Sequence, residues 1–412
     1  MSTHDLLRTG GLLLLSGAAS AQDAAPAFTL RGFGTLGVVR SDTDQAEYIR
    51  DVSQPKGATR SPDWGVDSRV GIQANYRFDE SWEAVAQAVA SRRYDATFTP
   101  EVTWAFLKWR ATDAVDLRAG RLGFDVYPLA DTRNVGYSYL WVRPPVEFYG
   151  GIPITDFDGA DLVVHGPLGG GYAQWKLFAG KAQGKIPSSD HSTFDLGGSP
   201  LLGTHVDFRE GRWGFRLAFA QLQFKSEFNA DIDGLLATLR SPAVASVSPT
   251  TPALADELAI TDKWVRYLSL SLEYERGAFR SQLSLSRTAT QTPVLPTSYA
   301  GYLTSSLRRG AWTPYLSLAA VKTASPQRST GLPDLPPFQP LNAGVQQYLG
   351  TNRNDQRTLA LGLRWDVHRN LCLKAQVDAI DAGRQTHQLW WRADPAWSGH
   401  TTVASLSLDF VF

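Results

Sequence analysis

The chain has 412 residues, enough for two ordinary domains or for one large barrel. Lys plus Arg and Asp plus Glu each number 40, so the formal net charge is zero and the basic excess expected of a nucleic-acid-binding protein is missing. The single cysteine, Cys372, excludes an internal disulfide and a cysteine-based zinc site, and no segment after the N-terminus approaches the ~20 apolar residues of a membrane-spanning helix.

The N-terminus has the three parts of an export signal. Arg8 supplies a positive charge, residues 10–17 with four consecutive leucines form a short apolar core, and Ala19-Ser20-Ala21 fits a small-residue cleavage site. We therefore expect residues 1–21 to be a signal peptide and residues 22–412 to form a single domain. The alternative is a disordered or helical N-terminal tail.

Hydrophobicity alternates with a period of two. From Trp64 to Phe78, apolar side chains occupy the even positions and polar or charged side chains the odd ones. The C-terminal segment repeats this pattern, with Leu406, Leu408 and Phe410 on one face. A helix would place apolar residues three and four positions apart, so these segments are predicted to be strands.

The same pattern recurs along the chain and predicts sixteen strands, an even number, as in single-chain bacterial barrels. The predicted strands begin near Phe28, Trp64, Trp82, Val102, Val115, Gly159, Tyr172, Leu201, Arg212, Lys263, Ala278, Ser298, Trp312, Arg357, Leu371 and Thr401. Short Gly-, Asp- and Asn-rich turns alternate with long connections. Long connections without clear periodicity include residues 41–63, 181–200, 225–262 and 323–356. This alternation predicts short turns and both chain ends on one rim, and long loops on the other.

A soluble β-sandwich also alternates, so the polar face and the aromatics decide between the two folds. Charged residues such as Arg216 and Asp161 fall at mid-strand on the polar face, and aromatics such as Trp82 and Trp312 lie beside short turns on the apolar face. Such aromatics form the interfacial girdles of membrane barrels. Since hydrocarbon forbids an open sheet edge, we predict an all-β, closed transmembrane antiparallel barrel whose sixteen strands leave an aqueous lumen.

With these features the chain resembles the Gram-negative outer-membrane porin superfamily over its whole mature length. It ends in Phe412 after alternating apolar residues, as porins do when the outer-membrane assembly machinery recognises them, although Ser407 stands where the usual signal has glycine. The stretches 117–122 and 134–145 are also similar to a segment shared by porin-like proteins of unassigned substrate. The resemblance implies contact with outer-membrane lipid and lipopolysaccharide, and a possible homotrimer.

The third long loop, from about Leu122 to Phe157, follows the fifth predicted strand, and the resemblance implies that it folds into the lumen and forms the constriction. Its many prolines and large aromatics are consistent with packing inside a barrel. An outward or subunit-packing loop is the alternative. The charged constriction candidates are Asp125, Asp131, Arg133, Arg143, Glu147, Asp156 and Asp158 of this stretch, Arg121 near its start, and the wall residues Arg69, Arg93, Lys108 and Arg118.

The predicted function is passive diffusion of small hydrophilic solutes or ions through a water-filled lumen. The alternatives are a channel specific for a sugar, amino acid or anion, and a barrel enzyme using His205 or His191. His165 and His205 fall on the predicted lumen face, whereas His191, His387 and His400 fall in loops. No convincing catalytic partner accompanies any of them, so we interpret each as a solvated loop residue rather than a catalytic one. The sequence indicates no metal ligands and no cofactor.

Overall fold

The computed structural model describes residues 27–189, 192–324, 327–383 and 389–412. The predicted signal peptide at residues 1–21 lies outside the described residues and stays a prediction. Within the described ranges, no helix has the length and apolar character needed to cross a membrane.

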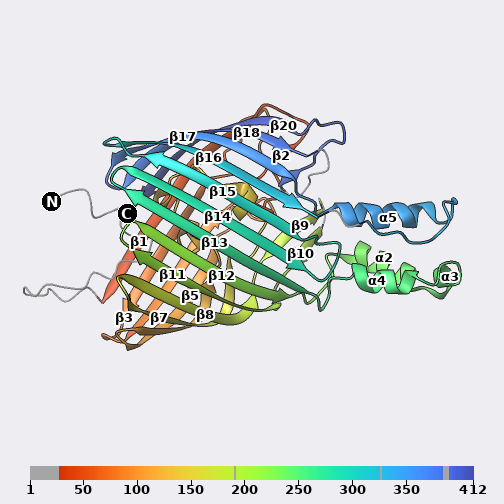
Figure 1. The fold of residues 1–412 in the computed structure, drawn as a ribbon, viewed down its shortest axis with the longest axis horizontal. Helices are drawn as coiled ribbons and strands as arrows, with labels where there is room; N and C mark the ends of the chain where they lie inside the picture. The colour runs from red at the N-terminus through yellow and green to blue at the C-terminus, as the bar shows by residue number, and fades with distance from the viewer. Residues whose placement is uncertain (1–26, 190–191, 325–326, 384–388) are drawn as a thin grey trace, which may run out of the picture.

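Sixteen strands of the described chain form one closed antiparallel barrel, as the sequence predicted (Figure 1). Sequence neighbours pair around the wall, and β1 closes the barrel by pairing with β20 on one side and β3 on the other. The barrel strands are β1 (Phe28–Ser41), β3 (Arg69–Arg77), β4 (Trp82–Ser91), β5 (Glu101–Thr112), β6 (Val115–Gly123), β7 (Asp156–Leu168), β8 (Gly171–Ala182), β11 (Pro200–Glu210), β12 (Trp213–Gln223), β13 (Trp264–Arg276), β14 (Phe279–Thr290), β15 (Ser298–Leu307), β16 (Trp312–Thr323), β17 (Gln356–His368), β18 (Leu371–Ala382) and β20 (His400–Val411).

The observed strand starts lie within three residues of the predicted ones, except for β3. The pattern from Trp64 predicted a strand there, but β3 begins at Arg69. The Asp63 carboxylate accepts hydrogen bonds from the backbone N–H groups of Gly65 (2.7 Å) and Val66 (3.0 Å). These bonds hold residues 63–66 in a turn, which delays the strand.

Alternation along each strand separates an apolar exterior from a polar interior. On β20, Leu406 is 57% exposed, whereas the adjacent Ser405 and Ser407 are each 3% exposed. Aromatic pairs lie beside the short turns on the outer face, with Trp82 stacked on Trp109 and Trp312 stacked on Trp365. An exterior of this kind fits hydrocarbon, with aromatics at the level of the lipid headgroups.

Tight turns join the hairpins at one rim. Gly169, Gly211, Gly277 and Gly310 have φ between +56° and +59°, a left-handed conformation that glycine adopts without steric cost. β1 begins and β20 ends at this rim, which therefore carries both ends of the described barrel (Figure 1).

The opposite rim carries structured loops, including helices that the sequence reading did not predict. Two small sheets pair β2 (Glu47–Tyr48) with β19 (Trp390–Trp391), and β9 (Lys185–Ser189) with β10 (Ser192–Asp195). The connection 225–262 contains α2 (Ala230–Arg240), α3 (Pro242–Ala245) and α4 (Thr251–Leu258), and 323–356 contains α5 (Gln339–Gly350). These helices project beyond the barrel wall (Figure 1). Asn229 caps α2 by accepting a hydrogen bond from the N–H of Ile232, a local signal visible in the sequence.

Candidate pore constriction

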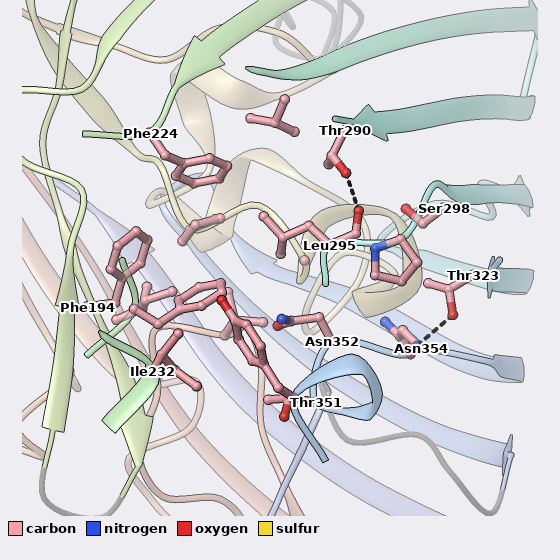
Figure 2. Close-up of a pocket in the computed structure, with 18 of the residues that line it drawn as sticks. Phe194, Phe224, Ile232, Thr290, Leu295, Ser298, Thr323, Thr351, Asn352 and Asn354 are labelled. Carbon is pink, nitrogen blue, oxygen red and sulfur yellow. Dashed lines mark hydrogen bonds between the residues drawn. The ribbon is translucent and has the colours of Figure 1, made fainter. Parts of the chain in front are cut away.

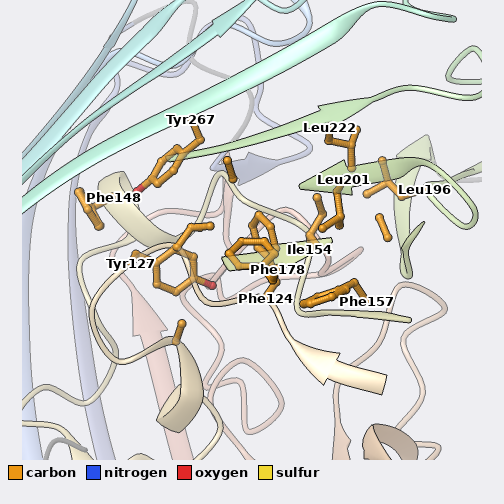
Figure 3. Close-up of a cluster of buried hydrophobic side chains, with 14 of the residues drawn as sticks. Phe124, Tyr127, Phe148, Ile154, Phe157, Phe178, Leu196, Leu201, Leu222 and Tyr267 are labelled. Atoms are coloured by element: carbon orange, nitrogen blue, oxygen red, sulfur yellow. The ribbon is translucent and has the colours of Figure 1, made fainter. Parts of the chain in front are cut away.

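The segment between β6 and β7, residues 124–155, contains three short helical turns. These are η1 (Ala130–Thr132), η2 (Gly136–Ser138) and α1 (Val146–Tyr149). Its aromatic side chains pack with wall residues in one buried cluster, where Phe124, Tyr127 and Phe148 lie near Phe178 and Tyr267 (Figure 3). The segment is therefore tightly packed, as its prolines and aromatics predicted.

One end of the segment is held by a carboxylate in a basic pocket. Asp125 is 3% exposed and accepts hydrogen bonds from Lys176 Nζ (3.1 Å), His205 Nε2 (3.0 Å) and Arg216. These three side chains come from the neighbouring strands β8, β11 and β12. Burial acts to raise the pKa of Asp125, but Arg216, Lys176 and His205 hold this pKa well below its ordinary value.

Farther along the segment, Arg143 provides a second anchor, of the opposite charge. Arg143 is 1% exposed, and its guanidinium lies 3.2 Å from Asp67, which precedes β3, and 4.0 Å from Asp378 on β18. It also donates to Ser405 on β20 and lies over the ring of Tyr48. Around the barrel these strands lie opposite the strands that hold Asp125.

Between Asp125 and Arg143, inward-facing side chains of the wall bind the backbone of the segment. Lys374 on β18 donates to the carbonyls of Gly136 (2.7 Å) and Trp141 (2.9 Å), and Arg364 on β17 donates to the carbonyls of Tyr137 and Tyr139. These cations replace partners that irregular backbone would otherwise take from water.

Two further candidates connect the segment to the wall. Arg69 on β3 donates to Tyr139 Oη at 2.8 Å and to the carbonyl of Arg133 at 3.2 Å. Glu147, 4% exposed, accepts hydrogen bonds from Gln356 Nε2 (2.7 Å) and from Thr358. Burial raises the pKa of Glu147, which favours its neutral form.

The η1 turn carries the least constrained of the predicted charges. Arg133 donates to Tyr127 Oη at 2.6 Å and to the carbonyl of Ile154 at 3.3 Å, both within the segment. Asp131 is half-buried and forms no ion pair of 4 Å or less with another described residue. Asp131 therefore keeps a carboxylate that is not neutralised by direct contact.

The remaining candidates form a ladder of ion pairs on β5, β6 and β7. Its members are Lys108 with Asp116 (2.9 Å), Arg118 with Asp161, and Arg121 with Asp158 (2.8 Å) and more distantly with Asp156 (4.0 Å). Arg93 lies apart from this ladder, in the connection after β4, where it pairs with Glu101. The bases in contact with Asp125 are Lys176, His205 and Arg216, and a constriction formed by segment carboxylates facing Arg69, Arg93, Lys108 and Arg118 stays a prediction.

Sequence reasoning missed the partners that hold the segment. Arg216 was recognised as inward-facing, but only the fold shows that it converges with Lys176 on Asp125. The interpretation of His205 as a solvated loop residue is wrong, since it is 1% exposed on β11, between Asp125 and Asp207. His165 also lies on a strand, where it bonds to Tyr172 Oη at 2.7 Å. His191 and His387 lie outside the described residues.

Within the described ranges, no group of three or more His, Cys, Asp or Glu side chains could hold a metal ion. The sequence matches no protein-family profile and no curated protein. Solved structures provide the similarity instead.

Three of these structures illustrate it. OmpF of Salmonella typhi, in complex with daunomycin, is 10% identical with a TM-score of 0.55, covering 93% of this chain and 97% of that one. The outer membrane channel DcaP of Acinetobacter baumannii is 10% identical with a TM-score of 0.54 and the same coverage. The anion-selective porin from Comamonas acidovorans is 12% identical with a TM-score of 0.50, covering 93% and 100%. At these identities the likeness is one of fold, and the fold is that of the Gram-negative outer-membrane porins, as the sequence predicted.

Proposed function

We propose that this chain is an outer-membrane channel for passive diffusion of ions and small hydrophilic solutes, narrowed by residues 124–155. The observation that carries the proposal is the set of bonds between this segment and inward-facing side chains on β3, β8, β11, β12, β17, β18 and β20. A segment bound to strands on opposite sides of a closed barrel crosses its lumen. Contacts with lipid and lipopolysaccharide, homotrimer formation and assembly through Phe412 belong to the same proposal.

The open passage is proposed to run between η1 and the strands β4 to β7. No hydrogen bond of the described residues joins the segment to the inner face of β4, β5 or β6, and two inward-facing side chains there keep partial exposure, 18% for Lys108 and 33% for Arg121. On the other side, inward-facing Ser271 and Ser284 are at most 3% exposed. Asp131 and Arg133 would face solutes in this passage.

Planar-bilayer recording of the refolded mature protein tests the channel. We expect stepwise ion currents, and silence in correctly folded protein would contradict the proposal. Asp131→Asn should shift the reversal potential in a salt gradient towards anions, because Asp131 is not neutralised by direct contact. The matched control is Asp334→Asn, an exposed carboxylate on the long-loop rim, which should leave the reversal potential unchanged.

Cysteine labelling locates the passage. In a Cys372→Ser background, a small charged thiol reagent should reduce the current of Asp131→Cys and leave that of Ser271→Cys unchanged. The reverse result would place the passage on the β13 side of the segment.

A further inference from the structure

A large cavity lies at the long-loop end of the barrel, and its chemistry differs from that of the constriction. Its volume is about 1280 Å³, above the 300–1,000 Å³ typical of small-molecule pockets. Segment residues Phe124, Phe148 and Ile154 contribute to its lining, and so do side chains of α2 and α5. A solute entering from this end would meet the cavity together with the segment.

The lining is largely aromatic and aliphatic, with polar residues such as Gln221, Asp231 and Thr288 among the apolar ones. Phe224, Phe194, Phe228 and Tyr348 follow one another in ring contact, with centroid separations of 6.0, 4.8 and 6.3 Å. Figure 2 shows Phe194, Phe224 and Ile232 directed towards the same space. Several apolar lining residues are only half-buried and therefore present surface to a ligand; these are Ile186, Phe228, Ile232, Leu235, Leu295 and Leu341.

Several polar groups at the cavity are already occupied. Thr290 donates to the carbonyls of Leu295 and Thr292, and Thr323 Oγ1 accepts from the N–H of Asn354 at 3.0 Å (Figure 2). Asn352 donates its amide to the carbonyl of Val294 at 3.2 Å. Two buried atoms of the lining, Asn354 Oδ1 and Trp391 Nε1, have no hydrogen-bond partner among the described residues. Much of the remaining surface is apolar, which favours a ligand with few hydrogen-bonding groups.

We propose that this cavity binds an uncharged aromatic small molecule on the route through the channel, which makes the channel selective rather than general. A carbohydrate is disfavoured, since its many hydroxyls would have to give up water for a largely apolar wall. The inference rests on the proposed channel function and narrows its substrate class.

Solute block of single-channel current tests the proposal with indole as the probe and D-xylose as a polar solute of similar size. Added on the long-loop side at millimolar concentration, indole should interrupt the ion current, and xylose should do so at least tenfold more weakly. Equal or stronger block by xylose would overturn the inference while leaving the channel intact.

Cavity variants separate specific binding from the partitioning of indole into lipid. Phe228→Ser and Ile232→Asn should each weaken block at least fivefold, with ion conductance unchanged. Phe98→Ser and Leu335→Asn change exposed apolar residues that do not line the cavity. Indole should block the current of these control variants as strongly as that of the wild type. Block that is equal in cavity and control variants would overturn the inference.

If the protein conducts no ions, the proposed function fails, and the cavity is then tested by equilibrium dialysis of indole against protein in nanodiscs. Retention by the wild type with loss in Phe228→Ser supports the site, and retention equal to that of empty nanodiscs rejects it.

Discussion

Two anchors of the segment 124–155, at Asp125 and at Arg143, are held in opposite ways. Asp125 is an acid among three bases, whereas Arg143 is a base beside two acids. Both side chains are at most 3% exposed. If Asp125 and Arg143 exchanged places, like charges would lie together on both sides of the barrel. The charge pattern therefore favours one orientation of the segment.

The two anchors differ in how they respond to losing their central charge. Without Asp125, the bases Lys176 and Arg216, which ordinarily keep their charge, would retain only longer ion pairs, 3.6 Å to Asp161 and 3.7 Å to Asp207. Without Arg143, Asp67 and Asp378 would be left, and carboxylates can take up protons. An arginine cannot lose its charge to reduce the repulsion in this way, because it stays protonated at any accessible pH.

The largest effect is therefore expected for Asp125→Ala. Removing one partner of a buried ionic cluster costs about 3–5 kcal/mol. Denaturant titration of protein in lipid vesicles measures this free energy of unfolding, and open-channel noise reports the freed segment. A loss below about 1 kcal/mol would mean that the basic cluster does not hold the segment.

Acid provides a second view of the same anchor. The pKa of Asp125 is below its unfolded value, so its contribution to stability is complete above about pH 4 and is lost as pH falls through the folded pKa. The wild type should therefore become noisier only in strong acid. Asp125→Asn should lack this transition, and an identical acid profile in both proteins would contradict the assignment.

A charge introduced on the outer face of the barrel would have no ion-pair partner there, unlike Asp125 and Arg143 inside it. Leu406 faces outward, so Leu406→Arg should destabilise the barrel by about 2–4 kcal/mol near the bilayer midplane. Folding yield in vesicles of increasing thickness measures the effect, with Leu406→Ile as the control. Normal folding of Leu406→Arg would mean that this face of β20 does not contact lipid.

Arg143→Ala should cost less than Asp125→Ala, and its cost should shrink as the pH is lowered, because two buried carboxylates left without their counter-charge take up a proton more readily than exposed ones. Comparing the free energies of unfolding of the two variants at pH 8 and pH 5 tests the asymmetry directly. Equal costs with equal pH dependence would show that proton uptake by Asp67 and Asp378 does not reduce the destabilisation caused by losing Arg143.

The sequence predicted the strands of the barrel better than the contacts of the segment 124–155 inside it. Alternation placed strand starts such as Trp82, Val115 and Ser298 because each depends on a local two-residue pattern and a nearby turn. The partners of Asp125 come from residues 176, 205 and 216, which the register of three neighbouring strands brings together. Such contacts depend on how the segment crosses the barrel, and no local pattern encodes that path.

The smallest effect is expected for Glu147→Gln. Glu147 is a buried acid like Asp125, but its hydrogen-bond donors, Gln356 and Thr358, are uncharged. Burial raises the pKa of Glu147 above its unfolded value, so the folded state favours the protonated acid and loses stability as pH rises through the folded pKa. Glutamine keeps the carbonyl oxygen that accepts from Gln356 and Thr358 but carries no charge. We expect a change under about 1 kcal/mol at pH 5 and a small gain at pH 8. Destabilisation of the glutamine variant at both values would show that Glu147 is held as a charged group, like Asp125.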